Sequence, residues 1–325
     1  MGVNRREFLM GAIGAAGSAA LSRFAHAARA HVMGGPAFGT YWRATLPLDA
    51  DHLRARSAIE DVIAAIDASL SPFRPGSDIS RFNAAPPATW MEMGGDAAAV
   101  MGEGVRIAAL TGGAFDPTVG PIVARYGFGP IRGAEDGGFR GLDVKGSAAR
   151  KDCPGLTFDP CGIAKGFALD RMAQRLGGLG LGNYVIELGG EICARGAHPA
   201  GRPWQVGIER PAPGPIRFQR IVRLGDETMA TSGDLANRYD IGGRRYTHIV
   251  DPGKTAPVAN GVASVSVIAA RAMTADALAT GLMVMGPERG LKLAERLALG
   301  VLFVLRERGR LTEAASTRFG DYLVA

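Results

Sequence analysis

Residues 159–188 read DPCGIAKGFALDRMAQRLGGLGLGNYVIEL. The stretch begins with a glycine turn, continues with a helical pattern over 163–176 and ends in the strand-like run 184–188. A turn of this kind exposes backbone groups and aims the N-terminus of the helix at a bound group such as a phosphate. The same letters also suit an ordinary strand–turn–helix unit with a buried glycine, and neither dinucleotide-binding nor P-loop spacing is present.

Helical and strand patterns alternate unevenly on both sides of this stretch. Strand-like runs are expected at 31–47, 204–208, 219–224, 262–269 and 300–306, and helices at 96–111, 274–285 and 287–298. Runs of strands separated by unevenly spaced helices favour an α+β fold over a doubly wound sheet.

The region between the first strand and residue 159 is predicted to contain one more helix and two long loops. A polar loop is expected over 71–83, and the Gly- and Pro-rich region 117–155 is expected to form surface loops at a seam between two lobes. The helix is predicted from apolar side chains on one face: Leu53, Ile59, Val62, Ile63 and Ile66.

The N-terminus has the pattern of an export signal. Arg5 and Arg6 precede an apolar run over 9–21, and residues 25–27 form a small-residue A-x-A site. The paired Arg followed by Phe-Leu resembles the twin-arginine type. The alternative is an N-terminal membrane anchor, although the run is shorter than the about 20 residues that span a bilayer. We therefore assign residues 1–27 to a signal peptide and 28–325 to the mature domain, and expect a periplasmic protein.

Composition argues against several classes of protein. The chain has 325 residues, of which 47% are hydrophobic and 21% charged, with a formal net charge of +6. This charge is small and no basic tract is interleaved with aromatic residues, so the sequence does not indicate nucleic-acid binding. The three cysteines, Cys153, Cys161 and Cys193, form no C-x-x-C pair, which argues against a disulfide scaffold or a zinc site. Beyond the signal, no apolar stretch is long enough to span a membrane.

Asp276 and Thr280 are four residues apart in an otherwise apolar helical segment. On a helix they share one face. A carboxylate beside a hydroxyl offers hard oxygen ligands of the kind that Mg²⁺ takes, with waters and substrate phosphates completing the octahedron. The same spacing also suits a capping Asp and a Thr bonded to the helix carbonyls.

His248 lies where a strand enters a turn, in the run 245–252, and the motif Thr231-Ser232-Gly233-Asp234 precedes it. An imidazole titrates near neutrality and can act as a general base. A lone His in a strand is also commonly structural. The stretch 113–121, GAFDPTVGP, reads locally as a helix-to-loop junction.

Further motifs occur at 38–40 (FGT), 71–83 (SPFRPGSDISRFN), 187–191 (ELGGE) and 247–252 (THIVDP). Together with the motifs above, their order and spacing resemble the ApbE-like flavin transferases, also called FAD:protein FMN transferases. The resemblance covers nearly all of the mature chain.

The resemblance implies an ApbE-like, T-fold-related α+β domain of two lobes, with FAD in the cleft between them. It implies a Mg²⁺ ion, or Mn²⁺, held by Asp276, Thr280 and a backbone carbonyl of Gly162. The implied flavin contacts are Phe38, Phe73, Ala114, Phe115, Asp116, Asp159, Lys165 and Val250.

Four positions, at three places in the chain, depart from the family pattern. Phe38 stands where Met is usual, and Phe73 where Tyr is frequent; both keep an apolar surface for the flavin. Pro160-Cys161 replaces a Leu/Gly-type stretch, but a carbonyl ligand remains possible because any residue supplies one.

The activity implied by the resemblance is Mg²⁺-dependent transfer of FMN from FAD to a Ser or Thr hydroxyl of an exported or membrane-bound redox protein, with release of AMP. NosR-, Nqr- or Rnf-type subunits of electron-transfer systems are the expected partners. Asp276 and His248 are the expected catalytic residues, with His248 accepting the hydroxyl proton. The alternatives are an FAD pyrophosphatase that yields FMN and AMP, and a non-catalytic periplasmic FAD carrier.

Replacing both Arg5 and Arg6 by Lys is expected to keep the protein in the cytoplasm, because twin-arginine signals are read by a receptor. Immunoblots of periplasmic and cytoplasmic fractions measure this. Normal periplasmic accumulation of the double variant would instead indicate a general secretory signal or an anchor.

Overall fold

The computed structural model describes residues 30–135, 137–235, 237–242 and 244–324. The proposed signal peptide lies outside these residues. Among the helices of the described ranges, none combines the length and apolarity needed to cross a membrane.

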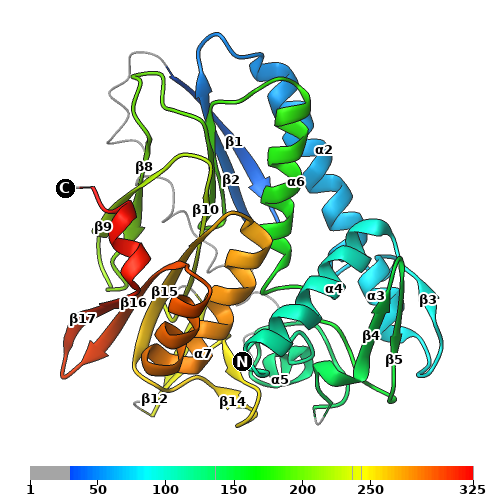
Figure 1. Ribbon diagram of the computed structural model, residues 1–325. Coiled ribbons are helices and arrows are strands. Elements are labelled where there is room, and N and C mark those ends of the chain that lie inside the picture. Colours follow the sequence, from blue (N-terminus) through cyan, green and yellow to red (C-terminus); the bar gives the residue numbers. More distant parts are fainter. Residues whose placement is uncertain (1–29, 136, 236, 243, 325) are drawn as a thin grey trace, which may run out of the picture.

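An eight-stranded antiparallel sheet forms the centre of the molecule (Figure 1). Its spatial order is β1-β2-β6-β7-β10-β15-β16-β17. The strands are β1 (Ala30–Ala37), β2 (Thr40–Pro47), β6 (Tyr184–Leu188), β7 (Glu191–Arg195), β10 (Thr228–Gly233), β15 (Val262–Ala269), β16 (Gly300–Glu307) and β17 (Arg310–Ala315). Every residue of β15 is buried, as expected for a strand covered on both faces.

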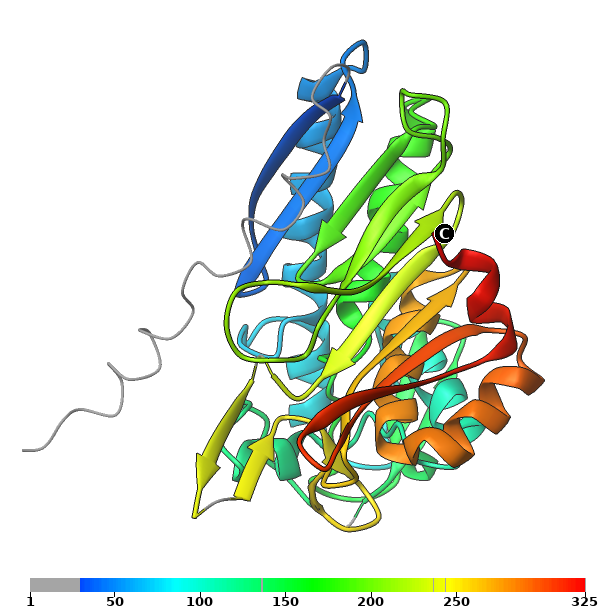
Figure 2. The same ribbon diagram turned by 90° about the vertical axis from the view of Figure 1, so that its left-hand side faces the viewer.

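Three helices cover one face of this sheet: α2 (His52–Leu70), α6 (Ala164–Gly178) and α7 (Ala272–Arg296) (Figure 1). On the other face, the hairpin β8 (Trp204–Glu209) and β9 (Phe218–Leu224) packs with η3 (Thr317–Tyr322) in a smaller core around Trp204 and Phe319. The hairpin β11 (Arg238–Ile241) and β12 (Arg244–Thr247) projects from one edge, in yellow in Figure 2. A short pair follows it, β13 (Val250–Asp251) and β14 (Ala256–Pro257).

The second part of the molecule holds α3 (Asp78–Ala84), α4 (Gly95–Leu110), α5 (Gly120–Arg125) and η2 (Phe139–Gly141). A three-stranded sheet joins them, with β3 (Met91–Glu92), β5 (Ala148–Lys151) and β4 (Leu142–Lys145) in that order. The buried core is continuous with that under the large sheet. The α+β class is therefore confirmed.

Several local predictions are confirmed. The expected helices at 96–111 and 163–176 correspond to α4 and α6, and the strand-like runs at 184–188, 204–208, 219–224, 262–269 and 300–306 correspond to strands. The two helices expected at 274–285 and 287–298 form the single element α7. It is kinked at the boundary expected between the two helices, because Gly286 has a φ of 76° and Pro287 follows it.

Three local predictions are wrong. The single strand expected at 31–47 is the hairpin β1–β2, which turns at Phe38-Gly39 with φ of 49° and 75°. Leu53 does not share the buried face of α2, since it is 82% exposed in the first turn. The polar loop at 71–83 contains α3, because the Ser77 side chain caps its N-terminus and Ile79 and Phe82 are buried.

The expected loop region 117–155 is also more ordered than predicted. It contains α5, η2, β4 and β5, which the density of Gly and Pro hides from a periodicity argument. Ile122 is buried there, and the buried Phe139 and Leu142 belong to the main core, which joins the region to the body of the protein.

Helices α6 and α7 are joined at their N-terminal ends by bonds in both directions. Gly166 N donates to Asp276 Oδ2 at 2.9 Å. In return, Asp170 accepts from Ala272 N at 2.8 Å and from Met273 N at 3.1 Å, which caps the first turn of α7. A Cβ atom on Gly166 would lie 2.3 Å from Ala272 O, so the approach requires glycine.

Gly166→Ala is expected to lower the free energy of unfolding by about 1–3 kcal/mol, because α6 and α7 must move apart. Gly177→Ala in the same helix is the matched control, since a Cβ there meets no atom within 4 Å. That change is expected to raise stability by up to about 1 kcal/mol through the helix propensity of Ala. Urea denaturation of both variants measures the difference; equal effects would contradict the close-packing argument.

Candidate active site

Asp276 is the buried carboxylate at the centre of the candidate site. It is 4% exposed and lies in α7 close to the helix N-terminus. The bond from Gly166 N occupies Oδ2, so the lone pairs of Oδ1 remain available to a cation. The Asp therefore has a fixed orientation before any ligand binds.

Thr280, one turn further along α7, meets two other parts of the chain. Its Oγ1 lies 3.1 Å from Ser232 Oγ at the end of β10. A Cβ built on Gly162 would lie 3.5 Å from Thr280 Oγ1 and 3.2 Å from the ring of Phe115. The structure thus brings Gly162, Phe115 and Thr280 together; their roles in binding a cation and the flavin stay predictions.

A buried group of charges lies next to Asp276. Lys165 Nζ forms an ion pair with Glu191 Oε2 at 2.5 Å, and Glu191 is 3% exposed. Burial raises the pKa of Glu191 to about 7, although the Lys165 charge acts in the opposite direction. Burial alone would lower the pKa of Lys165, but the carboxylates of Glu191 and Asp276 outweigh it and raise that pKa.

Burial also raises the pKa of Asp276, against the opposing effects of Lys165 and the Gly166 N–H group. Two buried carboxylates share one ammonium group here. A divalent cation beside Asp276 would favour its ionised form.

The donor set fits a hard cation such as Mg²⁺. The Asp276 carboxylate and Thr280 hydroxyl lie on one helix, and Gly162 brings backbone close to Thr280 because it has no side chain. Within the described residues, no group of three or more His, Cys, Asp or Glu side chains is placed to hold a metal ion. The carboxylate of Asp276 and the hydroxyl of Thr280 are both oxygen donors, as is the carbonyl of any nearby backbone.

His248 is half-buried between the hairpin β11–β12 and Phe128, with ring centroids 6.3 Å apart. Its Nδ1 lies 3.3 Å from the Asn237 carbonyl oxygen. A carbonyl only accepts, so this contact places the proton on Nδ1 and leaves the lone pair on Nε2. Burial lowers the pKa of His248; the bond to the Asn237 carbonyl acts in the opposite direction, and the charge of Lys165 lowers the pKa further, so the net shift favours a neutral imidazole that can accept a proton.

Asp116 and Asp159 organise the two loops beside Phe115. Asp116 accepts from Thr118 N at 2.9 Å, Thr118 Oγ1 at 2.6 Å and Phe139 N at 3.2 Å. Asp159 accepts from Cys161 N at 2.9 Å, while its own N–H donates to Pro117 O at 2.6 Å. Burial raises the pKa of both carboxyls. The sequence motifs at 113–121 and 159–166 are thus adjacent in space.

The remaining expected flavin contacts lie in different surroundings. Phe38 is half-buried in the β1–β2 turn. This turn lies near Lys165, as shown by Gly189, where an added Cβ would contact both Thr40 and Lys165. Phe73 is 73% exposed in the loop before α3. No contact found in the described part of the chain joins Phe73, Ala114 or Val250 to Asp276; their lining of an FAD site stays a prediction.

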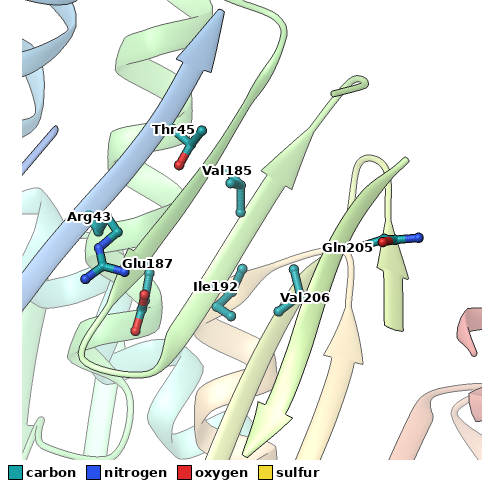
Figure 3. A pocket seen from close by; sticks show the side chains of 7 residues that line it. All are labelled: Arg43, Thr45, Val185, Glu187, Ile192, Gln205 and Val206. Atoms are coloured by element: carbon teal, nitrogen blue, oxygen red, sulfur yellow. The ribbon is translucent and has the colours of Figure 1, made fainter. Parts of the chain in front are cut away.

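A small cavity lies on the opposite face of the sheet, lined by residues of β2, β6, β7 and β8 (Figure 3). Its volume of about 20 Å³ is roughly that of one water. It is too small for a dinucleotide and lies away from Asp276, so it does not mark the FAD site.

Sequence reasoning missed two residues of this cluster as site residues. Glu191 and Ser232 belong to the quoted motifs 187–191 and 231–234, but neither was assigned a role. Each lies on a strand of the large sheet, and only the sheet order places β7 and β10 beside α6 and α7. The only local signal was a charged or hydroxyl residue beside glycines.

The chain matches known proteins over nearly its whole length. The ApbE family model matches residues 38–303. A Vibrio cholerae protein named FAD:protein FMN transferase is 36% identical over 307 residues, which cover 90% of this chain and 92% of the relative. The protein of the same name from Escherichia coli K12 is 32% identical over 319 residues, covering 92% and 91%.

Solved structures agree with these matches. The flavin transferase ApbE from Vibrio cholerae superposes with a TM-score of 0.82 at 35% identity, over 90% of this chain and 100% of that one. The apo form of the Pseudomonas stutzeri flavinyl transferase ApbE gives a TM-score of 0.81 at 31% identity, over 91% and 98%. Because the family model spans residues 38–303 and the relatives are this similar over nearly the whole chain, the chain belongs to the ApbE family.

Proposed function

We propose that this enzyme is a FAD:protein FMN transferase that joins FMN to a Ser or Thr hydroxyl of a partner protein. The names of its relatives support the class of reaction. The observation that carries the assignment of the site is the buried Asp276 carboxylate, fixed by Gly166 and one helical turn from Thr280.

In the proposed reaction the acceptor hydroxyl attacks the phosphorus atom that bears the FMN moiety of FAD. A phosphoester bond forms to the acceptor oxygen, the diphosphate P–O bond breaks, and AMP leaves. The hydroxyl proton goes to Nε2 of His248. The protein otherwise positions the groups and stabilises the charge on the transferred phosphoryl group.

Asp276, Thr280 and the Gly162 carbonyl would hold Mg²⁺, or Mn²⁺, in this proposal. A bound divalent cation supplies neutralisation of the diphosphate charge. Lys165 adds a positive charge of its own, and its ion pair with Glu191 keeps that ammonium in place.

The proposed location is the periplasm, on the strength of the export signal at residues 1–27. The acceptor would then be an exported or membrane-bound redox protein, such as a NosR-, Nqr- or Rnf-type subunit. FAD lies, in this proposal, between the two parts of the molecule, next to Phe38, Phe73 and Phe115.

Phe73→Ala is expected to weaken FAD binding by roughly ten- to a hundredfold, because it removes an aromatic contact worth on the order of 1–3 kcal/mol. The melting temperature of the apo-protein is expected to stay unchanged, since Phe73 is 73% exposed. Flavin fluorescence titration measures the affinity. Leu53→Ala is the matched control, an exposed apolar side chain elsewhere, and is expected to bind FAD normally. Equal affinities of the two variants would remove Phe73 from the flavin site.

Asp276→Asn is expected to reduce FMN transfer by about 100-fold or more at limiting Mg²⁺, with partial recovery at high Mg²⁺, because a neutral amide oxygen binds the cation more weakly. The variant is expected to fold, since an Asn oxygen can still accept from Gly166 N. Transfer to the soluble domain of an Nqr-type subunit is followed by in-gel flavin fluorescence across a Mg²⁺ titration.

Asp170→Asn is the matched control for this experiment. Asp170 bridges the same two helices through backbone N–H groups, but lies at the cap of α7 and not beside Thr280. It is expected to alter the melting curve slightly and to leave the Mg²⁺ dependence unchanged. Near-wild-type transfer by Asp276→Asn at limiting Mg²⁺ would rule out the metal assignment. Release of free FMN with no labelled acceptor would indicate a pyrophosphatase.

A further inference from the structure

Ser232, Asp234 and Asn237 follow one another where the chain leaves β10, and each makes a contact near the candidate site. Ser232 Oγ lies 3.1 Å from Thr280 Oγ1. The Asn237 carbonyl accepts from His248 N at 3.3 Å and lies 3.3 Å from His248 Nδ1. One short stretch of chain therefore touches both the proposed metal ligand and the proposed base.

Asp234 lies between these two contacts and is 6% exposed. It accepts from Arg245 Nη1 at 2.7 Å. It also accepts from Arg306 twice, from Nη2 at 2.8 Å and from Nε at 3.2 Å. The Arg306 guanidinium donates two bonds to this carboxylate, and the Arg245 guanidinium, from another strand, donates a third. A carboxylate bonded in this way has little freedom to move.

The spacing of these contacts joins two stretches of chain at two points. Asp234 precedes Asn237 by three residues, and Arg245 precedes His248 by three residues. The Asn237–His248 contact continues the antiparallel register of β11 and β12, in which Arg238 lies opposite Thr247, whereas the Asp234–Arg245 pair is a side-chain link outside that register. Arg306 lies on β16, so the links are fixed to the large sheet.

A role in stability alone explains this cluster poorly. The hairpin already has a four-pair register between β11 and β12, and Tyr239 stacks on Tyr246 with ring centroids 5.2 Å apart. Asp234 is buried, whereas the Arg245 and Arg306 side chains are 33% and 28% exposed, and ion pairs of either kind commonly add little net stability. What the cluster does supply is a fixed geometry.

We infer that Asp234 is a positioning residue for FMN transfer: with Arg245 and Arg306 it holds the Asn237 carbonyl against His248, which keeps the proton on Nδ1 and the lone pair on Nε2. The inference rests on the proposed function, in which His248 Nε2 accepts the proton of the acceptor hydroxyl. Asp234 itself touches neither FAD nor acceptor in this scheme.

Asp234→Asn is expected to lower kcat for FMN transfer by about 10- to 100-fold, because the base is displaced, while the KM for FAD changes less than about threefold. A second readout does not depend on activity. The ¹⁵N spectrum of the imidazoles reports the tautomer, and the whole chain has five His. Wild-type apo-protein is expected to show His248 protonated on Nδ1, and the variant a mixture of tautomers.

Asp143→Asn is the matched control, the same change in the Asp143–Arg150 pair of the three-stranded sheet. It is expected to alter neither kcat nor the His248 signal. Asp234→Glu keeps the charge and is expected to recover part of kcat. Should Asp234→Asn fail to fold, Arg306→Gln takes its place, since it leaves the Asp234–Arg245 pair intact.

An unchanged His248 tautomer in the folded variant would overturn the inference, whatever happens to kcat. So would a changed tautomer with wild-type kcat. If the wild-type protein labels no acceptor, the proposed function fails, whereas the tautomer comparison still decides whether Asp234 positions His248.

Discussion

The hydrogen bond from Gly166 N to the Asp276 carboxylate is the contact on which both the fold and the site depend. It lies where α6 and α7 approach so closely that a Cβ on Gly166 would overlap Ala272 O. In the opposite direction, the Asp170 carboxylate of α6 caps the first turn of α7. Each helix thus satisfies N–H groups at the start of the other, which would otherwise be buried without partners. The arrangement leaves Asp276 buried, oriented and close to the positive end of α6.

That position has an electrostatic consequence. Asp276 and Glu191 are both buried beside the single ammonium group of Lys165, and burial raises the pKa of both carboxyls. When both carboxyls are ionised, the cluster carries two negative charges and only the one positive charge of Lys165, so it has an excess of negative charge. The divalent cation of the proposed function would compensate this excess, and its own charge would then be available to a diphosphate. Burial, which is unfavourable for the carboxylates alone, would thus favour binding of that cation.

The sequence allowed prediction of features that depend on neighbouring residues. Asp276 and Thr280 share a face because they are four residues apart on a helix, and the α7 kink follows from Gly286-Pro287. The β1–β2 hairpin was missed because Phe38 occupies a left-handed turn position that favours Gly or Asn, so the run 31–47 reads as one strand. Glu191, Ser232 and Asp234 could not be given roles, since their neighbours come from distant strands and helices. The resemblance to a family supplied the remaining site assignments.

The turn before α6 explains why two unusual residues are tolerated next to the site. Pro160 contributes its carbonyl, which accepts from Ile163 N at 3.0 Å and Ala164 N at 2.8 Å, and its missing N–H is not required there. The backbone N–H of Cys161 donates to the Asp159 carboxylate, and Cys161 itself is exposed. The turn is therefore built from backbone groups that any residue provides. Gly162 differs, because a side chain there would contact Phe115 and Thr280 at the point where the proposed cation ligands meet. The physical constraint thus falls on Gly162 and Gly166, whereas Pro160 and Cys161, two of the departures from the family pattern, form the turn through their backbone groups, and the Cys161 thiol adds a further bond to Asp159.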